Sequence, residues 1–166
     1  MRCFITINDD RKENVMLQAS DLAKRFNLKP HKEGGDFLDL KPSRVPGVRD
    51  ASGAIYYYLP QGKHSEYHVI DCDEYWAFAA GGTLELWIIS PEGKLTIELL
   101  GVDDDANPLV FITAGSIFAA RHKNIAMQET FLSCITVPRF EHDGFRLVSK
   151  EEIAQLCPEA LEFCHV

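Results

Sequence analysis

The residue types best suited to chemistry lie in the middle of this sequence. His68 and Glu74 stand there in runs typical of β-strands, close to the aromatic residues Trp76 and Phe78. Alternate residues of a strand point to the same face, so Glu74, Trp76 and Phe78 share one face, and His68 shares a face with Ile70. If both faces point into the interior, an imidazole and a carboxylate meet in an aromatic-walled cavity.

Three roles are open to this pair. His68 and Glu74 can both bind a metal ion, or the carboxylate can orient the imidazole as a general base near neutral pH. The third role is structural, because a buried histidine and glutamate can simply satisfy each other by a hydrogen bond. Alternation alone does not decide between them, since a shift of one residue would turn His68 out of the interior.

The elements that must position these residues are short strands over residues 54–137. Turn signals separate the runs, and the Pro91–Lys94 segment predicts a tight hairpin. Many strands at this spacing without intervening helices indicate an antiparallel sandwich or barrel. The predicted strands are 54–59, 67–70, 75–79, 84–89, 95–100, 109–113, 117–120 and 130–137.

Two helices flank the strands. Apolar residues at helical spacing predict a helix over 15–27, which Pro30 prevents from running further. Ser149 and Glu152 form a capping-box pattern that predicts a short helix over 149–156. No linker separates these segments, so residues 1–166 are expected to form a single domain.

Two segments resemble the motifs of the cupin superfamily. His68, Glu74 and Gly81 follow the order of the first cupin motif, and Gly115 matches the glycine of the second. The resemblance implies an all-β fold, the cupin-type double-stranded β-helix or jelly-roll barrel, with an N-terminal helix and a short C-terminal helix. It places the barrel core at about residues 34–148 and implies a homodimer.

A subgroup of small single-domain cupins is more similar still, and its signature is Pro-His-Pro-Glu-Gly-Gly. The corresponding segment is Pro30-His31-Lys32-Glu33-Gly34-Gly35. Further matches extend the resemblance from about residue 27 to 148. They are Ala54-Ile55-Tyr56-Tyr57, Ser65-x-x-His68, Asp73-Glu74-x-Trp76, Val137-Pro138-Arg139-Phe140 and Phe145-Arg146-Leu147.

Departures from the cupin pattern fall on the metal ligands. Metal-binding cupins generally use three histidines and one glutamate, but Ile70 and Phe118 stand where two of those histidines would be. The remaining pair, His68 and Glu74, is one ligand short of the usual three. We therefore expect no metal and no other cofactor; if a metal is bound, His122 is expected to join His68 and Glu74.

A pocket for a small molecule is the site that the resemblance implies. Arg121 and Arg139 could neutralise an anionic ligand, although solvation at the surface is the plainer role for both. His31 and Glu33 could border the pocket or lie in an exposed turn. The residues expected to line the pocket are His31, Glu33, Tyr56, Tyr58, Trp76, Phe78, Phe118 and Arg121.

Composition and charge narrow the classes of partner and the location that are expected. The net charge of −8 and the scattered Lys and Arg residues argue against nucleic acid. No apolar run is long enough to span a membrane, and the N-terminal residues are too acidic for a signal peptide, which predicts a cytoplasmic protein. The five cysteines form no C-x-x-C pair and are expected to be reduced, unreactive thiols.

Three functions remain open, because a cupin fold alone specifies none. The first is a metal-independent isomerase or epimerase acting on a sugar derivative or hydroxy acid, with His68 as base and Glu74 as its partner. The second is a non-catalytic metabolite-binding or sensor module, which the apolar Ile70 and Phe118 favour. The third is a metalloenzyme with a non-standard ligand set.

Overall fold

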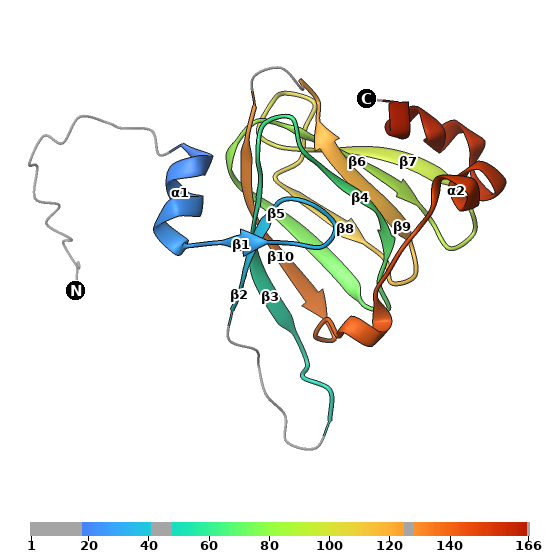
Figure 1. Cartoon of the computed structure of the whole chain (residues 1–166), viewed down its shortest axis with the longest axis horizontal. Helices are drawn as coiled ribbons and strands as arrows, with labels where there is room; N and C mark the ends of the chain where they lie inside the picture. Colours follow the sequence, from blue (N-terminus) through green and yellow to red (C-terminus); the bar gives the residue numbers. More distant parts are fainter. Residues whose placement is uncertain (1–17, 41–47, 125–127, 166) are drawn as a thin grey trace, which may run out of the picture.

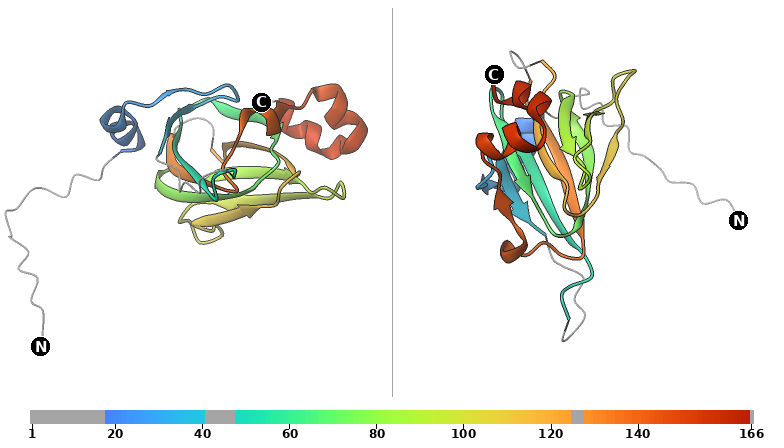
Figure 2. Two further views of the ribbon diagram at one scale, coloured as in Figure 1. Left: turned by 90° about the horizontal axis from the view of Figure 1, so that it is seen from below. Right: turned by 90° about the vertical axis from the view of Figure 1, so that its right-hand side faces the viewer.

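Two antiparallel sheets face each other and enclose the core (Figures 1 and 2). The computed structural model describes residues 18–40, 48–124 and 128–165. In the six-stranded sheet the order is β1 (Lys29–Pro30), β2 (Asp36–Asp39), β3 (Gly53–Leu59), β10 (Thr130–Val137), β5 (Asp73–Gly81) and β8 (Leu109–Ile112). In the five-stranded sheet it is β11 (Arg146–Leu147), β4 (His64–Val69), β9 (Ile117–His122), β6 (Leu84–Ile89) and β7 (Leu95–Leu100).

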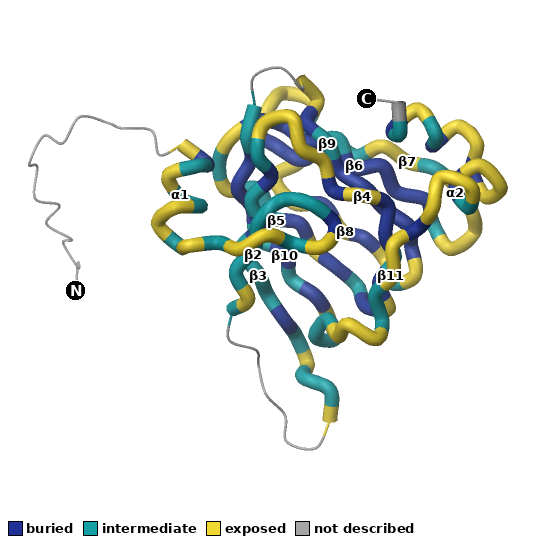
Figure 3. Tube along the Cα trace, viewed as in Figure 1, coloured by how far each residue is buried: buried dark blue, intermediate teal, exposed yellow. Residues whose placement is uncertain are grey.

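The chain passes repeatedly from one sheet to the other, which gives the jelly-roll topology. Strands β3, β5, β8 and β10 belong to the six-stranded sheet, and β4, β6, β9 and β11 to the five-stranded one. The inward side chains of both sheets form one apolar core that includes Tyr57, Trp76, Leu86, Phe118 and Leu132. Figure 3 shows this buried interior between the sheets. The expected all-β jelly-roll fold is confirmed.

Most strand predictions hold, because alternation and turn residues encode them locally. Strands β6, β7 and β10 begin and end at the predicted residues, and the hairpin between β6 and β7 closes where Ser90 N–H donates to the carbonyl of Lys94. Strand β4 is longer than the predicted run 67–70 and begins at His64. The short strands β1, β2 and β11 carry no alternating pattern and were not predicted.

Helix α1 (Ala19–Phe26) packs on the outer face of the six-stranded sheet. The ring of Phe26 lies 4.6 Å from that of Tyr56 on β3 and 6.0 Å from that of Phe131 on β10. The helix was predicted over 15–27. Its described part ends one residue earlier, at Phe26, because Asn27 adopts the left-handed conformation of a C-cap, and residues 15–17 lie outside the described range.

A second apolar cluster covers the outer face of the five-stranded sheet. Helix α2 (Lys150–Leu156) and the 3-10 helix η2 (Pro158–His165) lie beside this sheet (Figure 1). Their residues Ile153 and Phe163 pack in one cluster with Tyr67 and Trp87. Strand β6 is therefore buried on both faces, which explains why all its residues except Glu85 are apolar.

The predicted N-cap of α2 is present, but only half of the capping box forms. The Oγ of Ser149 accepts a hydrogen bond from the backbone N–H of Glu152 at 3.2 Å. The carboxylate of Glu152 instead accepts from both Nη atoms of Arg146, at 2.7 and 2.9 Å. None of the described helices is long and apolar enough to cross a membrane.

The outer cluster should contribute to stability independently of the interior. Ile153 is fully buried there, so Ile153→Ala should lower the free energy of unfolding by about 2–5 kcal/mol through lost contacts and a cavity. Leu156 on the same helix is 52% exposed, and Leu156→Ala should cost no more than about 0.5 kcal/mol. Urea denaturation of both variants measures the difference; equal losses would contradict this packing.

Candidate functional site

A cavity of about 340 Å³ lies at one end of the barrel interior. Its lining combines an inner group of histidine and glutamate side chains, an apolar wall and a polar rim. The inner group is His31, Glu33, His68 and Glu74; the wall includes Phe37, Ile55, Ile70, Cys134 and Phe140; the rim includes Asp39, Arg139, Glu141 and His142. The side chain of Glu141 is 59% exposed, so the cavity opens to solvent on that side.

A glycine-dependent turn brings Glu33 into the cavity. The N–H of His31 donates to the carbonyl of Gly35 at 3.0 Å, and Gly34 and Gly35 have φ angles of 112° and 67°. Such angles are readily adopted only by glycine. The carbonyl of Glu33 accepts from the N–H of Glu66 at 2.8 Å, which fixes the turn to β4. Glu33 is consequently only 7% exposed.

Both ring nitrogens of His68 have acceptors. Nδ1 lies 2.8 Å from the carbonyl oxygen of Glu66, which can only accept, so Nδ1 carries a proton. Nε2 lies 3.0 Å from Oε2 of Glu33. The ring of Phe118 packs against the imidazole of His68, with the two ring centroids 4.1 Å apart.

Glu33 and His68 form a buried ion pair. Burial by itself lowers the pKa of His68, but the charge and hydrogen bond of Glu33 outweigh it and hold that pKa above its usual value. Burial raises the pKa of Glu33, and the charge and hydrogen bond of His68 outweigh this too and hold it below its usual value. His68 is therefore an imidazolium beside a carboxylate, not a free base.

The structure corrects the expected partner of His68. The sequence pairs His68 with Glu74, whereas Nε2 contacts Glu33, which reaches it from the turn before β2. Nδ1 of His31 also approaches Glu33, at 3.2 Å from Oε1. Burial lowers the pKa of His31 more than Glu33 raises it, and Nδ1 accepts the N–H of Glu33 at 3.4 Å, so His31 is neutral at neutral pH.

Glu74 stands apart from this pair although it lines the same cavity. It is 7% exposed, and within residues 18–40, 48–124 and 128–165 no Lys, Arg or His forms an ion pair with it. Burial and then the negative charge of Glu33 raise the pKa of Glu74 to about 7; the indole of Trp76 and the charge of His68 offset this only in part. Glu74 therefore exchanges a proton near neutral pH.

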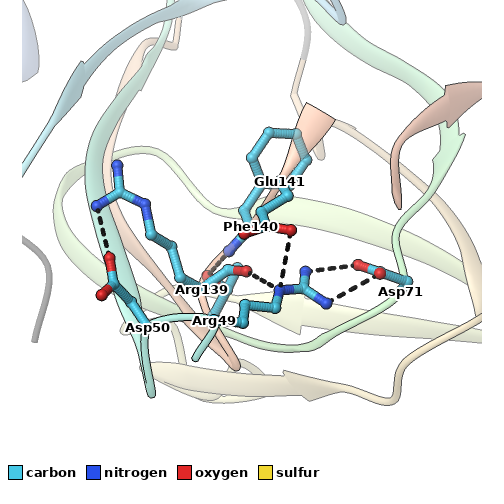
Figure 4. A network of polar contacts seen from close by, with 7 residues as sticks. Arg49, Asp50, Asp71, Arg139, Phe140 and Glu141 are labelled. Atoms are coloured by element: carbon cyan, nitrogen blue, oxygen red, sulfur yellow. Dashed lines mark hydrogen bonds and ion pairs between the residues drawn. The ribbon is translucent and has the colours of Figure 1, made fainter. Parts of the chain in front are cut away.

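Two arginines at the rim of the cavity, Arg49 and Arg139, are each bound by carboxylates (Figure 4). The guanidinium of Arg49 binds both carboxylate oxygens of Asp71 at 2.8 and 2.9 Å, and its Nε donates to the carbonyl of Arg139 at 2.7 Å. Arg139 in turn donates to Asp39 at 2.8 Å and lies 3.6 Å from Asp50. These contacts fix the rim and leave neither guanidinium without a carboxylate.

Three of the predicted pocket residues lie on outer faces of the sheets. Tyr57 points inward, so its neighbours on β3 point outward: Tyr56 packs on Phe26, and Tyr58 donates to Glu129 at 2.7 Å. Arg121 likewise points away from the barrel interior. It binds Glu85 at 2.9 Å and lies over the rings of Trp87 and Phe163. The structure does not bring these three residues to the cavity.

Three aromatic residues predicted for the pocket lie inside the barrel. Trp76 and Phe118 belong to the core, are at most 1% exposed and do not line the cavity, and Phe78 packs against the same core. They belong to the core cluster in which the cavity-lining residues Ile70 and Cys134 also pack. His31, Glu33, His68 and Glu74, by contrast, all reach the cavity.

The residues present do not fit the metal site of metal-binding cupins. Ile70 and Phe118 have no donor atom, and both nitrogens of His68 are already engaged. His122 lies four residues along β9 from Phe118, the partner of His68 in the sheet, so it is roughly 13 Å away along the strand. No group of three or more His, Cys, Asp or Glu side chains in the described residues is placed to hold a metal ion.

Several lining residues were not predicted. Phe37 and Asp39 follow the motif at residues 30–35, and Phe140 belongs to the match at residues 137–140, but nothing in their local pattern indicates a cavity. The alternation of side chains along β10 is enough to point Cys134 inward. Its thiol is unreactive, because burial and then the charges of Glu74 and Glu33 raise its pKa well above the usual range.

Comparisons with known proteins agree with the fold. The model of the family described as Cupin superfamily (DUF985) matches residues 20–148. A protein of Shewanella oneidensis is 32% identical, with a TM-score of 0.79 over 87% of this chain and 93% of its own. A hypothetical protein of Leishmania major is 22% identical, with a TM-score of 0.75 over 86% of this chain and 94% of its own.

A more distant structure shares the fold alone. A mutant of oxalate decarboxylase from Bacillus subtilis is 14% identical, with a TM-score of 0.57 over 82% of this chain and 34% of its own. None of the curated proteins compared with the chain matches it significantly.

The raised pKa of Glu74 predicts a pH-dependent stability. Because the folded state holds this proton more tightly, the stabilisation is complete below the unfolded pKa of 4.5 and is lost as pH rises through about 7. The free energy of unfolding of Glu74→Gln, relative to that of the wild type, should therefore rise by about 3 kcal/mol between pH 4.5 and 8. Urea denaturation across this range measures it. Glu92→Gln in the exposed hairpin should show no such gain, because the hydrogen bond from Ser90 lowers rather than raises the pKa of Glu92. Curves for Glu74→Gln and the wild type that run parallel would contradict the assignment.

Proposed function

Because the chain belongs to the family described as Cupin superfamily (DUF985), we propose that it binds a small polar molecule in the cavity between its sheets. One observation carries the proposal. The cavity floor holds charged and proton-exchanging groups, Glu33, His68 and Glu74, although they are almost completely buried. Burying such groups is costly, and perturbed titratable residues inside a concave pocket are typical of ligand sites.

The volume and lining support a metabolite-sized ligand. A cavity of about 340 Å³ is at the small end of the range for ligand pockets. Its wall is mainly apolar, and the polar groups converge at the floor and at the rim, an arrangement that buries a ligand and orients it. The rim arginines are held by Asp71, Asp39 and Asp50, so the entrance is formed before the ligand arrives.

Metal-independent isomerisation is the second candidate, favoured by the pKa of Glu74. A carboxyl group with a pKa of about 7 can take and return a proton at neutral pH, as isomerases and epimerases require. The base in this proposal is Glu74 and not His68, since His68 is held as an imidazolium by Glu33. The fixed charges of Glu33 and His68 would orient the substrate beside it.

Blocking the cavity should abolish binding. Cys134 lines the cavity, so Cys134→Phe should fill part of it and remove the thermal shifts that a panel of sugars, amines and organic acids produces with the wild type. Cys72 is equally buried but does not line the cavity, and Cys72→Phe supplies the matched control. Both variants should lose about 1–3 kcal/mol of stability from overpacking. Ligand shifts that survive Cys134→Phe would place binding elsewhere.

Solvent exchange tests the second candidate. Each compound that binds is incubated with the protein in heavy water, and deuterium entering a C–H position is followed by NMR. Isomerisation through Glu74 predicts incorporation by the wild type that falls at least about 100-fold in Glu74→Gln, the usual contribution of a general base. Binding without incorporation would leave a receptor rather than an isomerase.

A further inference from the structure

The cations that line the interior of the cavity are already neutralised. The imidazolium of His68 lies 3.0 Å from Glu33, and the guanidinium of Arg139 lies 2.8 Å from Asp39. Among the described lining residues the remaining histidines are His31, which is neutral, and His142, which is exposed at the rim. An anionic ligand would therefore find no unpaired cation at the floor of the cavity.

The carboxyl groups, by contrast, are in excess. Glu33 and Asp39 use the two paired cations, and Glu141 lies 3.8 Å from Arg49 at the rim. Glu74 is 93% removed from solvent, lines the cavity and has no ion-pair partner in the described part of the chain. A negatively charged ligand beside Glu33 and Glu74 would be repelled, whereas a positively charged one would be attracted by both carboxylates.

The wall suits the same kind of ligand. Phe37 and Phe140 line the cavity, and aromatic faces attract organic cations through their negative electrostatic potential. Carboxylates combined with aromatic rings recognise protonated amines, because the carboxylate accepts the N–H bonds and the rings contact the adjacent carbon atoms. An apolar wall alone would not select a charge, but it strengthens the interaction by excluding water.

We infer that the ligand of this cavity carries a protonated amine, bound by the carboxylate of Glu74 and packed against Phe37 and Phe140. The inference rests on the binding function proposed above and not on isomerisation, since a carboxylate paired with an ammonium group is not free to take a proton from carbon. Binding keeps Glu74 ionised, so a protein in which Glu74 is protonated releases one proton to solvent when the ammonium group binds.

Matched sets of compounds test the inference. Each set presents an amine, an alcohol and a carboxylate on a similar skeleton: glucosamine, glucose and glucuronate; benzylamine, benzyl alcohol and benzoate; ethanolamine, ethylene glycol and glycolate. Thermal shift and calorimetry should find at least one amine that binds about tenfold or more tightly than its two analogues, the effect of one charge-assisted hydrogen bond. Near pH 6 its binding heat should vary with the ionisation enthalpy of the buffer, which reports the released proton.

Variants locate the effect. Glu74→Gln should lose the preference for the amine and the proton release, and Cys134→Phe should lose binding altogether. Glu92→Gln, in the exposed hairpin between β6 and β7 and outside the cavity lining, should keep both. An alcohol or carboxylate that binds as tightly as its amine, and is lost in Cys134→Phe, would overturn the ammonium inference while the binding function stands. If neither these sets nor the metabolite panel bind in the cavity, both proposals fall.

Discussion

The structure depends on one buried contact, the ion pair of Glu33 and His68. It joins the turn between β1 and β2 of one sheet to strand β4 of the other, at the end of the barrel where the cavity lies. A charged pair inside a protein is tolerated only when its desolvation is compensated by good geometry and further hydrogen bonds. The carbonyl of Glu66 supplies such a bond to His68, and the left-handed backbone at Gly34 and Gly35 allows Glu33 to reach it.

The same pair determines the chemistry of its neighbour. Because Glu33 remains negative, the second buried carboxyl group, Glu74, keeps its proton to a higher pH than a solvated glutamate would. His68 is meanwhile held as a cation and contributes charge rather than basicity. The roles expected for a histidine and a glutamate in a shared pocket are thus redistributed over three residues, and the proton-exchanging one is an acid.

The sequence predicted what local patterns encode. Strand limits such as those of β6 and β10 follow from alternation and turn residues, and the cap of α2 follows from Ser149. It could not pair His68 with Glu33, because 35 positions separate them and no local rule links a turn to a strand of the opposite sheet. In the three-tyrosine run of β3, either Tyr57 or its two neighbours could face an aromatic core. Only the structure shows that Tyr56 and Tyr58 point outward.

The two-sided burial of β6 also has a consequence for partial unfolding. Its inner face is covered by other strands of the barrel, but its outer face, with Trp87, is covered by α2 and η2, which follow the last strand in the chain. If these two helices detached while the barrel stayed closed, the chain would present an apolar sheet face to solvent. A partly unfolded form of this kind would be prone to aggregate although its barrel is intact.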